Sequence, residues 1–153
     1  MKILVLLVTI FISGCGFTPL YSTTQNKNVC VEPIPEHEGY IIYQQLKNRF
    51  TGIKDCQYTL RVSTPVFKLS DAGISDHSFT TTQRINVKAT YTLFNKDKKK
   101  VLSSSAEAEG SSSIIDNPYA SVVARETNEQ NLLPILANSI ETHVSTFLLR
   151  NNQ

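Results

Sequence analysis

Apolar and polar positions alternate along much of the chain, and helical spacing replaces the alternation in two stretches. Alternation predicts four strands, at residues 29–34, 58–63, 80–94 and 101–113. Residues 40–50 and the stretch after Asn117 repeat their apolar side chains every three or four positions, which is typical of amphipathic helices. The order β-α-β-β-β-α predicts an α/β (α+β) two-layer sandwich, with a four-stranded mixed sheet covered on one face by two helices. Residues 70–78, rich in Ser, Asp and Gly, are predicted to form a loop.

The segment 80–94 has the longest strand pattern. Its apolar side chains fall on one face: Ile85, Val87, Ala89, Tyr91 and Leu93. Its polar side chains fall on the other: Arg84, Asn86, Lys88, Thr90 and Thr92. We expect the first face to be buried and the second to meet water or a polar partner. Arg84 and Lys88 are then either solvated or cross-strand-paired charges, or part of a site for an anionic ligand such as a phosphate.

The last helix has a clear start and an interruption. Asn117 is a good N-cap residue, and Pro118 suits the first helical position. Three apolar side chains of its first turns are expected to face the core: Tyr119, Val122 and Val123. Pro134 has no backbone N–H, so the helix is expected to kink or restart there.

The first 15 residues have the form of a bacterial lipoprotein signal. Lys2 precedes an apolar run at residues 3–11, and the small residues Ser13 and Gly14 lead to Cys15. The run is too short to span a bilayer core, which takes about 20 residues. Ile12-Ser13-Gly14-Cys15 is a lipobox, the signal for acylation of the cysteine and cleavage in front of it. Gly16 stands where an Asp would signal retention in the inner membrane, which indicates sorting to the outer membrane.

Removal of residues 1–14 as a signal peptide would leave 139 of the 153 residues, the size of one domain. We expect residues 15–28 to form a lipidated N-terminal tether and residues 29–150 to form a single domain. Lys2 is the only charged residue lost, so the net charge falls from +2 to +1. A nearly neutral chain lacks the basic surface that binds nucleic acid, so we expect no nucleic-acid partner.

The cysteines fit an oxidising compartment. Once Cys15 carries lipid, Cys30 and Cys56 remain, and two cysteines in a periplasmic domain favour one disulfide. The strand–helix–strand order favours a parallel crossover, which would bring the strands at these two cysteines side by side. The histidines are too scattered to indicate a zinc site: His37, His77 and His143.

No catalytic motif is present in the sequence. It contains no G-x-S-x-G, no phosphate-binding loop and no H-E-x-x-H. The serines of the last predicted strand have no histidine or carboxylate at an informative spacing. We therefore expect a protein that is not an enzyme and that uses no metal or other cofactor.

Three stretches of the chain resemble the alphaproteobacterial lipopolysaccharide-assembly lipoproteins, the LptE family. Cys15-Gly16-Phe17-Thr18-Pro19-Leu20-Tyr21 is similar to the mature start of these proteins. Residues 85–93 are similar to their long central strand. Asp116-Asn117-Pro118-Tyr119-Ala120, with Asn128-Glu129-Gln130 after it, is similar to the start of their last helix.

The resemblance implies a non-enzymatic role in lipopolysaccharide transport. LptE-family proteins lie in the lumen of the β-barrel translocon LptD, which they partly plug, and help lipopolysaccharide to reach the outer leaflet. They are also reported to bind lipopolysaccharide themselves. A basic position of the family falls near Arg125, which adds Arg125 to Arg84 and Lys88 as expected lipopolysaccharide contacts. A second basic position of the family has only His77 as its counterpart here.

The resemblance also implies a location. We expect the protein at the outer membrane, anchored by its N-terminal lipid on the periplasmic side, with its domain inside the lumen of an LptD-type barrel. A nearly neutral domain rich in Ser and Thr suits such a lumen, which is polar and hydrated. The alternative is a free cell-envelope lipoprotein with a structural or ligand-binding role and no barrel partner.

Lipidation at Cys15 can be tested directly. Mass spectrometry of the mature N-terminus should find a diacylglyceryl-modified Cys15, because the lipobox precedes it. Cys15→Ala should leave the domain folded and release it from the membrane, since acyl chains contribute roughly 0.8 kcal/mol per buried methylene. A mature chain that starts at Met1 or Gly16 without lipid would refute this prediction.

Overall fold

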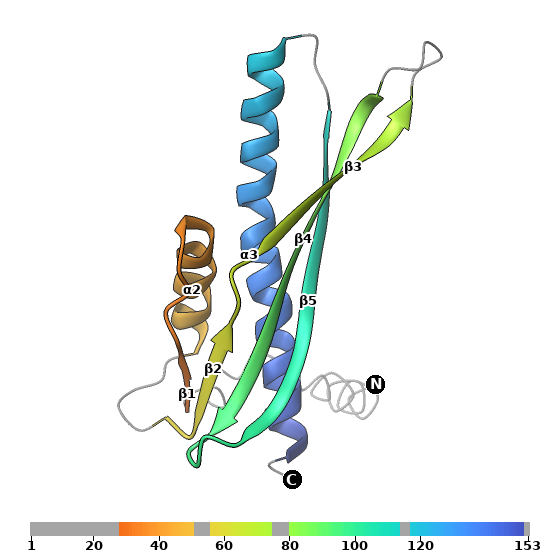
Figure 1. Ribbon diagram of the computed structural model, residues 1–153. Coiled ribbons are helices and arrows are strands. Elements are labelled where there is room, and N and C mark those ends of the chain that lie inside the picture. Colours follow the sequence, from red (N-terminus) through yellow and green to blue (C-terminus); the bar gives the residue numbers. More distant parts are fainter. Residues whose placement is uncertain (1–27, 51–55, 75–79, 114–116, 152–153) are drawn as a thin grey trace, which may run out of the picture.

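Five strands form one sheet, and both helices lie on the same face of it (Figure 1). The computed structural model describes residues 28–50, 56–74, 80–113 and 117–151. In chain order the elements are β1 (Val29–Val31), α2 (His37–Arg49), β2 (Tyr58–Val62), β3 (Val66–Ile74), β4 (Thr80–Asn95), β5 (Lys100–Ser113) and α3 (Pro118–Asn151). The predicted signal peptide and most of the predicted tether, with Cys15, lie outside the described residues.

The sheet has one strand more than the sequence predicts. Strand β3 includes residues 70–74, where we expected a loop, while residues 75–78 of that predicted loop lie outside the described residues. The prediction failed because Ser70, Asp71 and Gly73 are turn-forming by composition. Their backbone is held instead by the long edge of β4, with irregular register at Asp71/Gly73 and Gly73/Ile74.

Strand β4 is paired along both edges. Strand β5 pairs antiparallel with it from Thr82 to Phe94. Its other edge is shared, because β2 pairs with the C-terminal end of β4 and β3 pairs with the N-terminal part. Strands β2 and β3 therefore follow one another along the same edge of β4, and each pairs with β4 in antiparallel fashion. Strand β1 instead pairs in parallel with β2.

A bulge separates β2 from β3. Val62 lies opposite Tyr91, and Val66 lies opposite Lys88. The chain therefore advances four residues between β2 and β3 where β4 advances three. The extra residue reverses the side-chain alternation: Val62 faces the helices and Val66, 59% exposed, faces away from them. The Oγ of Ser63 stabilises the bulge by accepting a hydrogen bond from the backbone N–H of Thr90 at 3.0 Å.

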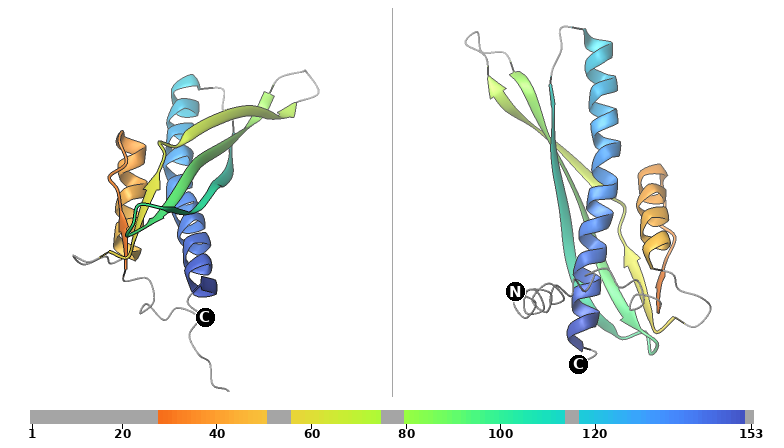
Figure 2. Two further views of the ribbon diagram at one scale, coloured as in Figure 1. Left: turned by 60° about the horizontal axis from the view of Figure 1, so that its bottom comes forward. Right: turned by 180° about the vertical axis from the view of Figure 1, so that it is seen from behind.

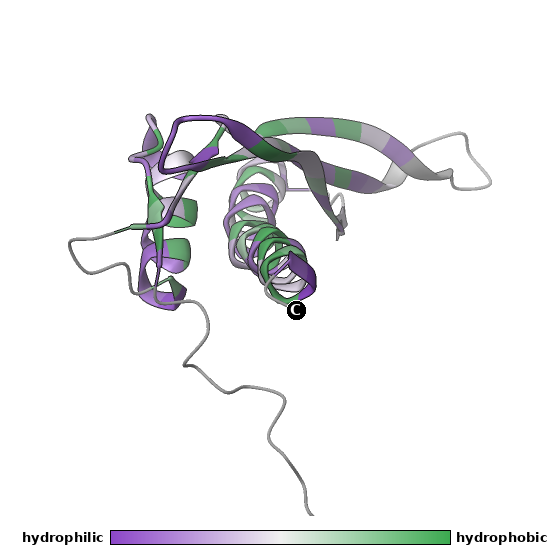
Figure 3. Ribbon diagram, turned by 90° about the horizontal axis from the view of Figure 1, so that it is seen from below, coloured by the Kyte–Doolittle hydropathy of each residue, from purple (hydrophilic) through white to green (hydrophobic). Residues whose placement is uncertain are grey.

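The core lies between the sheet and the two helices, as the view from below shows (Figure 3). The predicted alternation of β4 is confirmed, because the five side chains expected to be buried are at most 2% exposed: Ile85, Val87, Ala89, Tyr91 and Leu93. Helix α3 covers them with a buried stripe: Leu132, Leu133, Leu136, Ala137, Ile140, Val144 and Leu148. The hydroxyl of Tyr91 shares a hydrogen bond with Nδ1 of His143 at 2.9 Å, which satisfies the polar end of a buried ring.

Helix α3 starts as predicted but does not restart. Oδ1 of Asn117 accepts hydrogen bonds from the backbone N–H groups of Tyr119 and Ala120, so the N-cap is confirmed. The helix runs through Pro134 as one element (Figure 2, right). The neighbouring Leu133 and Leu136 are both fully buried against the sheet, and this packing offsets the hydrogen bond that the proline removes.

The first turns of α3 differ from the prediction. The side chains that we expected in the core are exposed: Tyr119 at 78%, Val122 at 42% and Val123 at 42%. They continue the helical spacing of the buried stripe, but burial of the helix starts only at Leu132. By length and composition alone α3 could cross a membrane. Its buried stripe is instead typical of a core helix.

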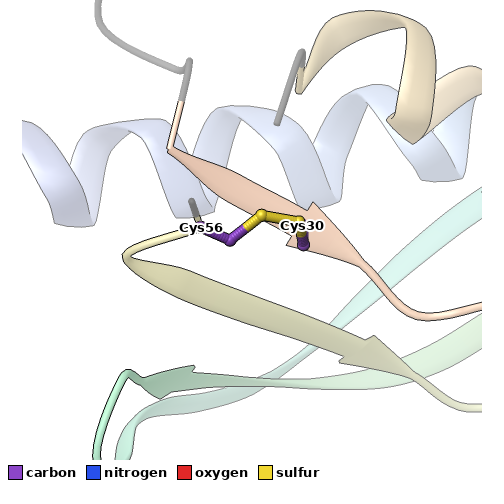
Figure 4. The surroundings of a disulfide bond; sticks show 2 residues. All are labelled: Cys30 and Cys56. Atoms are coloured by element: carbon purple, nitrogen blue, oxygen red, sulfur yellow. A yellow bond between two sulfur atoms is a disulfide. The ribbon is translucent and has the colours of Figure 1, made fainter. Parts of the chain in front are cut away.

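The structure joins Cys30 and Cys56 by a disulfide (Figure 4). Cys30 lies in β1, which pairs in parallel with β2, and Cys56 lies two residues before β2 begins. Their Cα atoms are 5.6 Å apart, within the usual range for a disulfide. The bridge encloses α2 in a covalent loop with a sequence separation of 26.

Removal of this disulfide should destabilise the domain. Chain entropy predicts a loss of about 3 kcal/mol in the free energy of unfolding for a loop of this size. Chemical denaturation of the Cys30→Ser/Cys56→Ser variant against wild type, both without reductant, measures the loss. Two freely reactive thiols in the native, non-reduced wild type would contradict the bridge.

Candidate functional site

The face of the sheet that the helices leave uncovered is polar, and we call it the helix-free face. Strand β4 contributes Arg84, Asn86, Lys88, Thr90 and Thr92 to it, as the alternation predicted. Strand β5 adds a row of small and acidic side chains: Ser103, Ser105, Glu107, Glu109 and Ser111. The result is a broad surface of hydroxyls and charges, away from the apolar core.

Most charges on this face form ion pairs across neighbouring strands. Nε of Arg84 lies 2.7 Å from Oε1 of Glu109, and Nζ of Lys88 lies 2.5 Å from Oε1 of Glu107. Nearer β1, Arg61 donates two hydrogen bonds to Glu32, of 2.7 and 3.1 Å. These side chains are exposed, so each pair adds little to stability. Their larger effect is to make the face nearly neutral.

The pairing shifts two pKa values. The hydrogen bond and charge of Lys88 hold the pKa of Glu107 below its usual value, and Asn86 and Lys68 lower it further. The hydrogen bond from Arg61 to Glu32, with the charge of that carboxylate, raises the pKa of Arg61. Both groups are therefore ionised at neutral pH, and the ion pairs persist there.

A groove of about 660 Å³ lies on the helix-free face beside the bulge. It is lined by Ser63, Thr64, Val66, Lys68, Asn86, Lys88, Thr90 and Glu107. The bulge forms one wall, because it turns Val66 and Lys68 of β3 onto the same face as Lys88. The volume falls in the range of about 300–1,000 Å³ that small-ligand sites occupy.

The structure separates the cations that the sequence grouped as lipopolysaccharide contacts. Arg84 and Lys88 lie together on the helix-free face, each paired with a carboxylate. Arg125 belongs to α3, on the opposite side of the sheet, and its Nε lies 3.7 Å from Oε1 of Glu129. The three expected contacts therefore lie on two sides of the sheet.

Sequence reasoning missed the partners of these cations and most of the groove. Val66 and Lys68 were overlooked because β3 was not predicted, although Val66-Phe67-Lys68-Leu69 alternates as a strand does. Glu107 and Glu109 could have been placed opposite Lys88 and Asn86 by folding the hairpin back from its charged turn. Within the described residues, no group of three His, Cys, Asp or Glu side chains converges as metal ligands would.

Comparison with known proteins finds similarity in structure but not in sequence. No protein-family model matches the chain, and no curated protein sequence matches it either. The structure is similar to rare lipoprotein B from Shewanella oneidensis, with a TM-score of 0.68, 10% identity and coverage of 82% of this chain and 98% of that one. The chain shares the fold of this lipoprotein.

Two further lipoproteins share this fold. Lipoprotein B from Nitrosomonas europaea has a TM-score of 0.63 and 10% identity, with 78% of this chain and 82% of that chain covered. A minor lipoprotein from Acinetobacter baumannii has a TM-score of 0.57 and 19% identity, with 79% and 94% covered. The likeness spans nearly the whole of the Shewanella and Acinetobacter chains, so it concerns the complete domain.

The Glu107–Lys88 pair should make stability depend on pH. Because the pKa of Glu107 is lowered in the folded protein, its contribution to stability is present above the pKa of the unfolded chain. That contribution is lost as the pH falls through the folded value. Denaturant unfolding of wild type and Glu107→Gln should differ at pH 7 and converge on acidification. A difference that grows toward low pH would contradict the pairing.

Proposed function

We propose that this protein is an outer-membrane lipoprotein that occupies the lumen of an LptD-type β-barrel and assists its assembly, and that it thereby aids insertion of lipopolysaccharide into the outer leaflet. The role is non-enzymatic. The observation that carries the proposal is the helix-free face, which is broad, rich in hydroxyls and nearly neutral through its own ion pairs.

A surface of this kind suits contact with the inner wall of a barrel. The interior of a large transmembrane barrel is polar, so a plug must cover it without leaving buried charges unpaired. The pairs Arg84–Glu109 and Lys88–Glu107 already neutralise each other, so a covering wall would desolvate paired rather than isolated charges. The rows of serine and threonine offer hydrogen-bonding groups of both kinds to such a wall.

Two further observations support the proposal. The lipobox at residues 12–15 would anchor the domain to a membrane, and the fold is shared with rare lipoprotein B, an LptE protein. Apart from the polar face, the domain also exposes apolar side chains on α3: Tyr119, Val122 and Val123. Contact with a barrel partner would remove these apolar side chains from water.

Direct contact with lipopolysaccharide is the finer part of the proposal. Arg84, Lys88 and Arg125 are the proposed contacts, since guanidinium and ammonium groups bind phosphates. An incoming phosphate must compete with Glu109 for Arg84 and with Glu107 for Lys88. Arg125 is less engaged, because its buried Nε has no hydrogen-bond partner among the described residues.

Co-purification tests the barrel partnership. The tagged full-length lipoprotein, extracted from its own envelope in mild detergent, should bring an LptD-type barrel with it in comparable amount. Ser103→Lys would place an unpaired cation on the helix-free face and should lower the recovered barrel about tenfold, which corresponds to 1.4 kcal/mol. Quantitative mass spectrometry of the eluate measures the ratio of the two proteins.

Asn48→Lys is the matched control, since it adds the same charge at an exposed polar position of α2. It should leave barrel recovery near the wild-type level. Recovery of the wild-type lipoprotein alone, from an envelope that contains such a barrel, would instead favour a free envelope lipoprotein. Depletion in cells gives an independent readout, because the barrel should then be lost or misassembled.

A further inference from the structure

Beside the bulge, the described charges of the helix-free face do not balance. Where β3 and β5 both pair with β4, this face carries three cations and two carboxylates: Lys68, Arg84 and Lys88 against Glu107 and Glu109. Arg84 and Lys88 are matched one to one by Glu109 and Glu107. The remaining positive charge belongs to Lys68, which forms no direct ion pair with a described carboxylate, although its charge lowers the pKa of Glu107.

Most other polar groups of the groove are already engaged. The Oγ of Ser63 accepts from the N–H of Thr90 and donates to the carbonyl oxygen of Thr64. Lys88 and Asn86 both hydrogen-bond Glu107. The groups left for a ligand are therefore the Lys68 ammonium and the hydroxyls of Thr64 and Thr90, beside the exposed side chain of Val66.

We propose that this groove binds a single carboxylate, from an Asp or Glu side chain that lies next to a small apolar side chain in a segment of the barrel partner. Lys68 is the counter-ion, the threonine hydroxyls hydrogen-bond the carboxylate, and Val66 packs against the apolar neighbour. This proposal rests on the barrel partnership and adds to it the chemistry of one contact.

The chemistry of the groove fits a peptide segment better than an acidic sugar. A sugar offers many hydroxyls and needs many free partners, while most polar groups here bond to one another. Among the described residues, no aromatic ring lines the groove. One free cation, two hydroxyls and an exposed valine match one carboxylate and one apolar group.

Photo-crosslinking in cells tests the occupant. A benzophenone amino acid replaces Val66 in the full-length lipoprotein. The side chain of Val66 is 59% exposed at the groove wall. We expect an adduct with the barrel, and peptide mapping should place the crosslink within a few residues of an Asp or Glu. An adduct with lipopolysaccharide alone would overturn the proposal in favour of a glycolipid site. The proposal would also be overturned if the substituted lipoprotein still co-purified with the barrel but formed no crosslink.

Charge reversal tests the role of Lys68. Lys68→Glu should reduce the barrel that is recovered about tenfold, Lys68→Gln should reduce it less, and Lys68→Arg should retain it. Lys96→Glu, an equal change in the β4–β5 turn, is the control and should have no effect. Circular dichroism and thermal unfolding should show that all four variants fold, because Lys68 has no ion pair to lose within the described structure.

The decisive step reverses both charges. Once the crosslink identifies the carboxylate, its replacement by Lys in the barrel should restore binding to the Lys68→Glu lipoprotein. Failure of this rescue, with wild type still bound, would refute the groove contact and leave the barrel partnership standing. Failure of the wild-type lipoprotein to bring any barrel would refute both.

Discussion

The alternation of side chains along β4 is the constraint on which the rest of the structure depends. Its inner residues are all buried beneath the helices, and its sixteen residues provide both edges on which β2, β3 and β5 assemble. A slip of one residue would exchange the buried and exposed sets, so the core fixes the register. The same register orients Arg84 and Lys88 away from the helices. The candidate surface is therefore a direct consequence of how the core packs.

The bulge between β2 and β3 reverses this alternation along one edge of β4. It lets two strands share one side of β4 while Leu60 and Val62 stay buried under the helices. Beyond it, Val66 and Lys68 point to the opposite face, where they form the wall of the groove. A regular strand would have left the groove without that wall. The bulge is thus what gives the helix-free face its groove.

The sequence correctly predicted the features that depend on short stretches of the chain. The parallel pairing of β1 with β2, the Asn117 cap and the buried face of β4 all follow from short-range signals, and the structure contains each of them. The partners of Arg84 and Lys88 depend on the β4–β5 register and on side-chain direction, because Glu109 lies opposite Asn86 and not opposite Arg84. The exposure of Tyr119 depends on where other elements cover α3, which spacing along a helix does not encode.

The charge of a surface is better judged after its ion pairs are formed than from its sequence. Counted along the chain, Arg84 and Lys88 indicate an anion site, because they lie four residues apart on one strand face. In the folded sheet each cation has a carboxylate on the neighbouring strand. An anion that binds either cation must displace this carboxylate, so it gains only the difference between the two interaction free energies. Lys68 was not a candidate in the sequence, and it forms no direct ion pair among the described residues, although its charge acts on Glu107. Beside the bulge an anionic group displaces no carboxylate that is hydrogen-bonded to Lys68, although it must approach the carboxylate of Glu107 there.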